Sequence, residues 1–406
     1  MDNFSPLTRE LNGILTKSAR KEHGIFFTPK SYRSVVLDFV KKICDPKRIL
    51  EPSFGSGEFI GDCVSVFPDS KIVGVELNTE LYTKVSDHFK DEPRISLTNC
   101  NFLDFQREEF FDLIVGNPPY VVVNSGTPDE FKHITTGRPN LYCWFIYKSI
   151  KMLADNGILA FVIPNSILNT SYYELLRKFI IDICEILCIF EFDKKDFEET
   201  DQTTIGLILK KHSSENRKYV VEHKGRVFFN VHYEFVNKHL KTYPCIEDLG
   251  LGVKTGSVVW NQHKQHLRDD ATQGKLLVYS SNNKGGKFVL FDGTQRNGKK
   301  QFIDLNKPTL KGPVILMNRG YGNSTYLNDL ILVEDDTLGH REFYAENHLN
   351  VIYPTEERGK EIIRHVYEYL LTEKSKDYIS KFVGNGALNK TEIATMLPVC
   401  LKEDDN

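Results

Sequence analysis

Hydrophobic residues in the first half of the chain occur in short runs that alternate with amphipathic stretches. Five runs have the length and composition of buried strands: 48–51, 71–77, 95–99, 111–115 and 158–163. Four stretches have the apolar spacing of helices: 58–67, 81–90, 141–153 and 172–184. Two further runs, 185–191 and 204–210, resemble a closing pair of strands. This alternation predicts βαβ units in an α/β fold with a mostly parallel, Rossmann-like sheet.

The alternation ends near residue 211. Residues 224–230 resemble a lone strand, and a linker with few apolar residues continues to about Pro244. Glycine and asparagine are frequent from Leu249 onward. Strand-like and helical runs then follow in irregular order, at 275–279, 289–291, 314–317, 355–372 and 374–382. We therefore expect a first domain at 1–244 and a second, α+β domain at 245–406.

Composition narrows the class of protein. Of the 406 residues, 40% are hydrophobic and 26% are charged, which is typical of a folded globular chain. There is neither a run of about 18 apolar residues nor a basic start followed by an apolar run, so we expect a cytoplasmic protein without a membrane span. The 8 cysteines form no CxxC pair and the 12 histidines show no ligand spacing, so we expect no metal.

Charge is unevenly distributed along the chain, although the net charge is only −3. Residues 51–200 carry 13 basic and 24 acidic side chains, whereas residues 251–312 carry 11 basic and 4 acidic ones. The basic stretch has two interpretations: it is an ordinary solvated surface, or it faces phosphate groups.

Acidic or glycine-rich segments follow three successive strands of the predicted sheet. Glu51 begins the segment EPSFGSG, in which Gly55 and Gly57 allow a sharp turn close to a ligand. Glu76 ends the next strand, near the spacing at which an acidic residue meets ribose hydroxyls, and Asp104–Phe105 follows the third strand. Because open α/β sheets bind ligands at the carboxyl ends of their strands, these segments predict a nucleoside cofactor. They do not distinguish NAD from S-adenosylmethionine.

The fourth strand ends in Asn117-Pro118-Pro119-Tyr120. Two successive prolines make a rigid loop that lacks two amide donors. The Asn117 side chain and the Pro118 carbonyl can together accept both hydrogens of a planar exocyclic amine, and Tyr120 offers an aromatic face for its ring. Such an amine can attack an activated methyl group without a strong base, because positioning and preorganised acceptors supply most of the rate.

With these motifs the sequence resembles the N6-adenine DNA methyltransferases, and the TaqI-type modification enzymes in particular. The resemblance includes the segments GIFFTP, EPSFGSGEF, VGVELN, NFLDF, NPPY and GILAFVIPNSIL. It implies S-adenosylmethionine as cofactor, bound by Phe26, Thr28, Glu51, Ser53, Gly55, Gly57, Glu76, Asp104 and Phe105. In this family Asp104 would contact the exocyclic amine of the cofactor and Phe105 its ring. Phe197 matches the phenylalanine that faces the motif tyrosine across the target base; Phe190 and Phe192 are alternative matches.

The resemblance also implies double-stranded DNA as substrate and a C-terminal target-recognition domain. A base inside a duplex is unreachable, so the enzyme must flip it out and repay that cost with contacts elsewhere on the DNA. Five residues of the second domain are candidates for these contacts: Lys254, Trp260, Asn261, Lys264 and Arg319. We expect a monomer that modifies a short site within a restriction–modification system, with the endonuclease encoded separately. A viral source, with action in the host cell, fits equally well.

Three alternative functions remain. NPPY also occurs in protein-glutamine and RNA-adenine methyltransferases, but the basic second domain favours DNA. A bifunctional restriction enzyme needs clustered carboxylates and a lysine; Glu222-His223-Lys224 has part of this pattern, without a convincing partner acid. A non-catalytic cofactor-binding subunit is disfavoured by the intact motif Asn117–Tyr120.

Overall fold

The computed structural model describes residues 3–14, 24, 26–123, 126–192, 203–212, 214–291, 293–295, 297–319, 330–334, 337–338, 342–383 and 388–401. The chain divides into two compact units, Met1–Val221 with Arg226–Tyr233, and Glu222–Gly225 with Glu234–Asn406. The second unit therefore includes residues that precede the boundary expected at 245. No described helix is long and apolar enough to cross a membrane.

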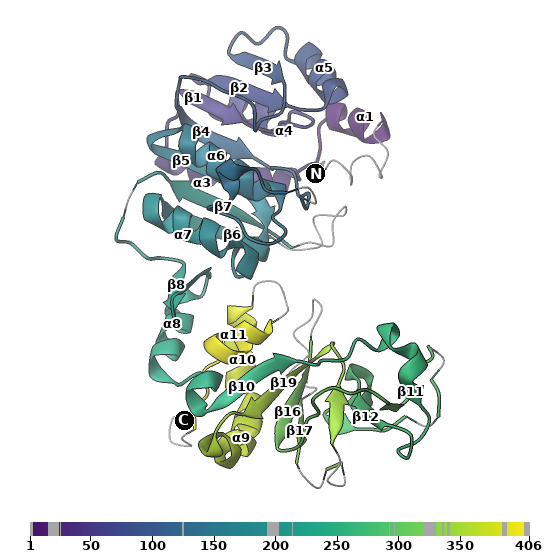
Figure 1. Ribbon diagram of the computed structural model, residues 1–406. Coiled ribbons are helices and arrows are strands. Elements are labelled where there is room, and N and C mark those ends of the chain that lie inside the picture. The colour runs from purple at the N-terminus through teal and green to yellow at the C-terminus, as the bar shows by residue number, and fades with distance from the viewer. Residues whose placement is uncertain are drawn as a thin grey trace. The chain divides into compact units, whose positions relative to one another are not determined.

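The first unit is built on a seven-stranded sheet with the order β3-β2-β1-β4-β5-β7-β6 (Figure 1). Strands β1 to β5 are parallel, and β7 is antiparallel to both β5 and β6, so the expected mostly parallel α/β sheet is confirmed. The strands are β1 (Arg48–Glu51), β2 (Lys71–Glu76), β3 (Ile95–Asn99), β4 (Phe111–Gly116), β5 (Leu153–Pro164), β6 (Glu185–Glu191) and β7 (Thr204–Lys210).

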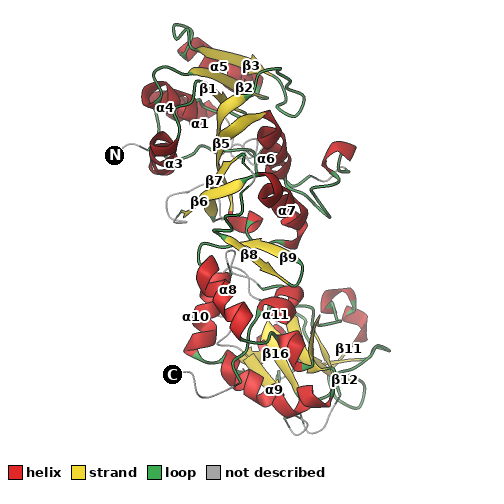
Figure 2. Cartoon of the chain, turned by 90° about the vertical axis from the view of Figure 1, so that its left-hand side faces the viewer, coloured by secondary structure: helices red, strands yellow, loops and turns green. Residues whose placement is uncertain are grey.

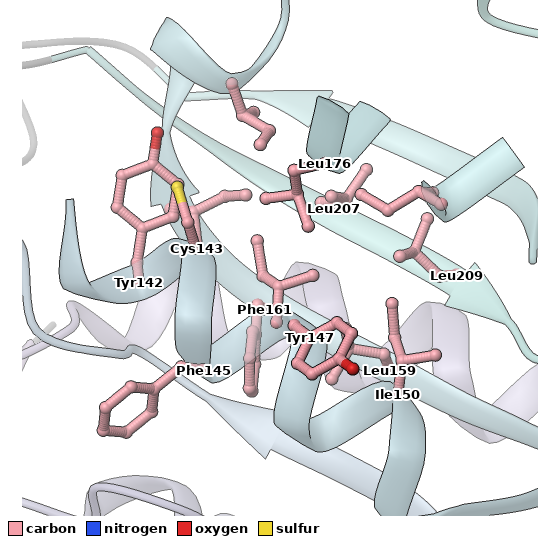
Figure 3. Packing of buried hydrophobic residues seen from close by; sticks show 14 of the residues in the cluster. Tyr142, Cys143, Phe145, Tyr147, Ile150, Leu159, Phe161, Leu176, Leu207 and Leu209 are labelled. Carbon is pink, nitrogen blue, oxygen red and sulfur yellow. The ribbon is translucent and has the colours of Figure 1, made fainter. Parts of the chain in front are cut away.

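Helices cover both faces of this sheet, α3 and α4 one face and α6 and α7 the other (Figure 2). Side chains along β5 alternate between two cores: Ile158, Ala160 and Val162 on one face, and Leu159, Phe161 and Ile163 on the other. Figure 3 shows the second core, where Tyr147 and Ile150 of α6 lie against the sheet. The helices are α1 (Pro6–Ile14), α3 (Lys30–Ile43), α4 (Glu58–Val66), α5 (Thr79–His88), α6 (Leu141–Met152) and α7 (Glu174–Ile183).

The second unit contains two four-stranded sheets, with orders β10-β19-β16-β17 and β11-β15-β12-β18. Figure 1 shows β10, β19, β16 and β17 side by side, and α9 packs against this sheet. Its longer strands are β10 (Leu251–Thr255), β12 (Lys275–Val278), β16 (Val314–Asn318), β17 (Leu330–Val333), β18 (Phe343–Ala345) and β19 (Leu349–Pro354). Its two-residue strands are β11 (Leu267–Arg268), β13 (Asn283–Lys284), β14 (Lys287–Phe288) and β15 (Phe302–Ile303). Its helices are α8 (Tyr233–Thr242), α9 (Glu357–Leu370), α10 (Glu373–Phe382) and α11 (Lys390–Met396).

Three sequence-based predictions about this region are wrong. The expected linker before Pro244 contains helix α8, which buries Val236 and Leu240 one helical turn apart. The expected lone strand is paired: β8 (Val220–His223) and β9 (Arg226–Phe229) form a two-stranded hairpin. Residues 289–291 lie outside any strand; the two-residue strand β14 ends just before them, at Phe288.

Candidate functional site

A cavity of about 240 Å³ lies at the carboxyl ends of β1, β2 and β4 in the first unit. The parallel pairing of β1 with β2 and β4 brings these ends together at one edge of the sheet. The cavity is lined by Gly24, Phe26, Phe27, Thr28, Glu51, Pro52, Ser53, Phe54, Gly55, Ser56, Glu58, Phe59, Glu76, Leu77, Asn78, Asn101, Phe102, Asn117, Pro119, Leu141 and Phe145.

The loop after β1 has the left-handed backbone that its glycines permit. Gly55 and Gly57 have φ values of 53° and 80°. A Cβ on Gly57 would also come within 2.9 Å of Val85 Cγ1, so a larger residue is excluded by contact as well as by conformation. The Gly55 amide donates to Glu76 Oε2 at 2.9 Å, which ties this loop to the end of β2.

Two buried carboxylates lie in the cavity wall. Glu76 accepts the amides of Gly55 (2.9 Å) and Asn78 (2.8 Å), one on each oxygen. Glu51 is only 2% exposed; its Oε1 accepts the Ser53 amide at 3.3 Å, and its Oε2 has no hydrogen-bond partner. Burial raises the pKa of both carboxyls, that of Glu51 well above its usual range, and the charge of Glu76 raises the Glu51 pKa further. The arrangement favours a cationic ligand.

Gly116 gives Glu51 the room that it occupies. A Cβ at Gly116 would collide with Glu51 Oε1, so any larger residue at the end of β4 would displace this carboxylate. The two residues lie at the ends of the neighbouring parallel strands β1 and β4, which explains their proximity.

Asn117 lies in the cavity wall with one amide atom bonded and the other unpaired. Its Nδ2 donates to the Phe26 carbonyl at 2.9 Å, which fixes the orientation of the amide. Its Oδ1 is buried and has no hydrogen-bond partner. Ser53 Oγ donates to the Asn117 carbonyl at 3.3 Å, so the backbone here is also held by the loop after β1. An oriented, unpaired amide oxygen is a preorganised acceptor for an N–H donor.

Tyr120 is held next to this acceptor but does not line the cavity. Its hydroxyl donates to the Val162 carbonyl at 3.0 Å, and its ring stacks on Phe26 at a centroid distance of 5.8 Å. Pro119 lines the cavity, whereas Pro118 is buried and does not line it. Phe197 belongs to the segment 193–202, which lies outside the described residues.

The turn after β3 places a different pair of residues at the cavity from the pair that the sequence predicted. Asp104 and Phe105 are expected at the cofactor, but neither lines the cavity, and Asp104 is exposed. Asn101 and Phe102 line it instead, because the turn begins only two residues after β3 ends. Lys148 Nζ of α6 donates to the Leu103 carbonyl at 2.6 Å and holds this turn in place.

Three lining residues were not among the candidates taken from the sequence. Leu77 lies within the segment VGVELN, directly after Glu76; it is 64% exposed and lines the cavity. Leu141 and Phe145 come from the first turns of α6, and the Phe145 ring lies 4.8 Å from that of Phe102. The spacing of Leu141 and Phe145 places them on one face of the helix that the sequence predicted at 141–153.

The second unit exposes four of its five candidate residues. Lys254, Asn261, Lys264 and Arg319 are exposed, whereas Trp260 is half-buried. Lys264 Nζ lies 5.8 Å from the centroid of the Trp260 ring, and Lys299 Nζ lies 5.5 Å from it. Within the described part of the chain, no group of three or more His, Cys, Asp or Glu is placed to hold a metal ion.

Comparisons with known proteins identify relatives of this chain. The family model of the Eco57I restriction-modification methylase matches residues 65–197. Modification methylase CviBIII of Paramecium bursaria Chlorella virus NC1A is 40% identical over 213 residues, which are 52% of this chain and 55% of that protein. Type II methyltransferase M.CvrRI of Paramecium bursaria Chlorella virus XZ-6E is 30% identical over 358 residues, 87% of this chain and 88% of that protein. The chain thus spans about half the length of the first relative and most of the second. Among solved structures, the M protein of the type I restriction enzyme EcoKI aligns with a TM-score of 0.38 and 18% identity, covering 47% of this chain and 45% of that chain.

Proposed function

Because this chain belongs to the type II modification methyltransferases, we propose that it methylates the N6 amino group of adenine in a short double-stranded DNA sequence. The methyl donor is S-adenosylmethionine, and the target base is flipped out of the duplex. The unpaired Oδ1 of Asn117 carries this proposal, because it is a fixed acceptor in the wall of a cavity that suits a nucleoside.

The cavity residues fit S-adenosylmethionine. The unpaired Oε2 of Glu51 suits a cationic group, and Glu76 has lone pairs left for ribose hydroxyls. Leu77, Phe102 and Phe145 offer apolar surface for an adenine ring. When bound, this cofactor supplies an activated methyl group.

The residues of the motif NPPY then orient the target. Asn117 Oδ1 and the Pro118 carbonyl accept the two hydrogens of the amine, which draws its lone pair out of conjugation with the ring. Tyr120 presents one aromatic face, held by its hydrogen bond to Val162, and Phe197 is proposed for the opposite face. Positioning and these acceptors supply most of the rate, so no strong base is needed.

A matched pair of substitutions tests the assignment of the adenine end of the cavity. Asn101 Nδ2 donates to Asp104 Oδ2 at 3.1 Å, so Asn101→Ala and Asp104→Ala both remove this hydrogen bond. Only Asn101 lines the cavity. Asn101→Ala is therefore expected to weaken cofactor binding by about 0.5–1.5 kcal/mol, and Asp104→Ala by much less. Calorimetry measures cofactor affinity in both variants. A larger loss of affinity with Asp104→Ala would favour Asp104, as the family resemblance implies, as the residue that contacts the cofactor's adenine.

We further propose that residues 245–406 recognise the DNA, through Lys254, Trp260, Asn261, Lys264 and Arg319. Lys264→Ala is expected to weaken cognate and random DNA alike and to reduce the salt slope of log affinity by about one unit. Asn261→Ala is expected to cost about 1–3 kcal/mol on the cognate site only. Lys360→Ala is the control, since this exposed lysine of α9 is paired with Glu357 at 2.8 Å. Equal salt slopes for Lys264→Ala and Lys360→Ala would argue against a phosphate contact.

The substrate class is tested by offering the protein labelled S-adenosylmethionine together with DNA, RNA and a protein extract. The proposal expects label in DNA. Label in RNA or in protein glutamine would favour the alternative methyltransferase functions, and cleavage of the DNA would favour a bifunctional restriction enzyme. We also propose that the protein acts as a monomer, in a bacterium or a virus-infected cell, alongside a separately encoded endonuclease.

A further inference from the structure

A buried arginine next to the cavity is not used by any motif described above. Arg33 lies in the first turn of α3 and is 2% exposed. Its Nε donates to Asp62 Oδ2 at 2.6 Å, and its Nη2 lies 2.6 Å from Glu58 Oε2. Its Nη1 donates to the Thr28 carbonyl. All three nitrogens are therefore bonded. Since helical side chains point toward the helix N-terminus, this position allows Arg33 to reach the segment that precedes its own helix.

The contacts of Arg33 continue into the cavity wall. Glu58 Oε1 accepts the Ser5 amide at 2.8 Å and the Thr8 hydroxyl, and Thr8 Oγ1 also lies 2.8 Å from Ser56 Oγ. Thr28, Ser56 and Glu58 all line the cavity. The contacts of Arg33 thus connect two separate segments of the wall, at Thr28 and at Ser56–Glu58, with the residues that begin α1.

Stability alone does not account for this cluster. A buried ion pair costs desolvation energy, and apolar replacements are often as stable. A guanidinium with three fixed acceptors does, however, impose one geometry on the segments that it joins. The geometry that it imposes here is that of the cavity wall beside β1.

We infer that Arg33 is a positioning residue that holds the Thr28–Ser56–Glu58 wall against the amino-acid portion of S-adenosylmethionine. This inference rests on the proposed function. The order β3-β2-β1-β4 separates the ends of the cavity: Asn101 and Leu77 follow β3 and β2, whereas Ser56 and Glu58 follow β1. With the adenine at β2 and β3, the remainder of the cofactor lies along the wall that Arg33 holds.

The test compares two ligands that share the adenosine group. S-adenosylhomocysteine carries the amino-acid portion, and 5′-methylthioadenosine lacks it. Arg33→Met is expected to weaken binding of the first by about tenfold or more and that of the second by less than about twofold. In turnover assays KM for S-adenosylmethionine rises by a similar factor, whereas kcat at saturating cofactor and KM for DNA stay within about twofold.

Arg177→Met is the matched control. This arginine of the same unit is also fully buried and donates to the carbonyls of Val227, Ile167 and Thr170, none of which lines the cavity. Arg177→Met is expected to lower the melting temperature of the protein. It should not change the affinity for one of the two ligands more than that for the other. Arg33→Lys retains the charge but reaches fewer acceptors, so we expect a loss of S-adenosylhomocysteine affinity between those of the unaltered protein and Arg33→Met.

If Arg33→Met does not fold, Thr8→Ala carries the same test, with an expected loss of about threefold for S-adenosylhomocysteine alone. Unchanged binding of S-adenosylhomocysteine, or equal losses for both ligands, would overturn the role of Arg33. Failure of the unaltered protein to bind either ligand would instead overturn the proposed cofactor, so the two failures are distinguishable.

Discussion

Asn117→Ala is expected to lower turnover by about 10²–10³-fold, the usual effect of removing one preorganised polar group from an active site. The variant loses Oδ1, the unpaired acceptor proposed for the target amine. Single-turnover measurements at saturating cofactor and DNA isolate this step from binding.

The control for Asn117→Ala is binding of the cofactor itself. Asn117 Nδ2 also holds the Phe26 carbonyl at 2.9 Å, so the substitution can loosen the cavity wall. Cofactor affinity within about threefold of the unaltered protein would show that this effect is small. Turnover that falls by less than tenfold, with such affinity retained, would contradict the role assigned to Asn117.

Glu51→Gln is expected to weaken S-adenosylmethionine binding by about 1.5–3 kcal/mol above neutral pH, the contribution of a hydrogen bond to a charged group. Burial raises the pKa of this carboxyl in the free protein, and a cationic ligand favours its ionised form. Affinity should therefore decrease as the pH is lowered through the raised pKa, with proton uptake by Glu51 competing with the ligand. Calorimetry in two buffers of different ionisation enthalpy measures the proton released on binding.

The same substitution should affect stability in the opposite direction. Such a carboxyl has a higher pKa in the folded protein than in the unfolded chain. It therefore stabilises the fold at pH values below the unfolded pKa, and this contribution is lost as the pH rises through the folded pKa. At neutral pH, Glu51→Gln is thus expected to raise the melting temperature of the ligand-free protein while lowering cofactor affinity. Glu80→Gln, at an exposed position of α5, is the control and should change neither quantity. If Glu51→Gln binds S-adenosylmethionine as tightly as the unaltered protein, with the same dependence on pH, a contact between Glu51 and the cationic ligand would be excluded.

The cofactor half was largely predictable from the sequence, because one rule of parallel sheets applies to it. Polar residues at the carboxyl ends of β1, β2 and β4 must meet at one edge, and Glu51, Glu76 and Asn117 do line one cavity. The rule is ambiguous at β3, because two pairs of a polar and an aromatic residue follow this strand in succession. Asn101–Phe102 lies closer to the strand end than the acidic pair Asp104–Phe105, and it is the pair that lines the cavity.

Residues outside the strand ends were harder to find. Phe145 belongs to a helix whose described side chains are mostly buried, and nothing in its spacing tells which turn faces a ligand. Arg33 is separated by 25 and 29 residues from Glu58 and Asp62, so its role appears only when α3 packs against α4. In the second unit, strands such as β11 and β15 are two residues long, too short for a period of two to be recognised.

The most direct test of the account is the identity of the methylated base. Duplex DNA of mixed sequence is incubated with the purified protein and labelled S-adenosylmethionine, digested to nucleosides and separated. The account predicts label in N6-methyladenine, confined to one short sequence when the modified positions are mapped. Label in a methylated cytosine, with none in N6-methyladenine, would contradict it.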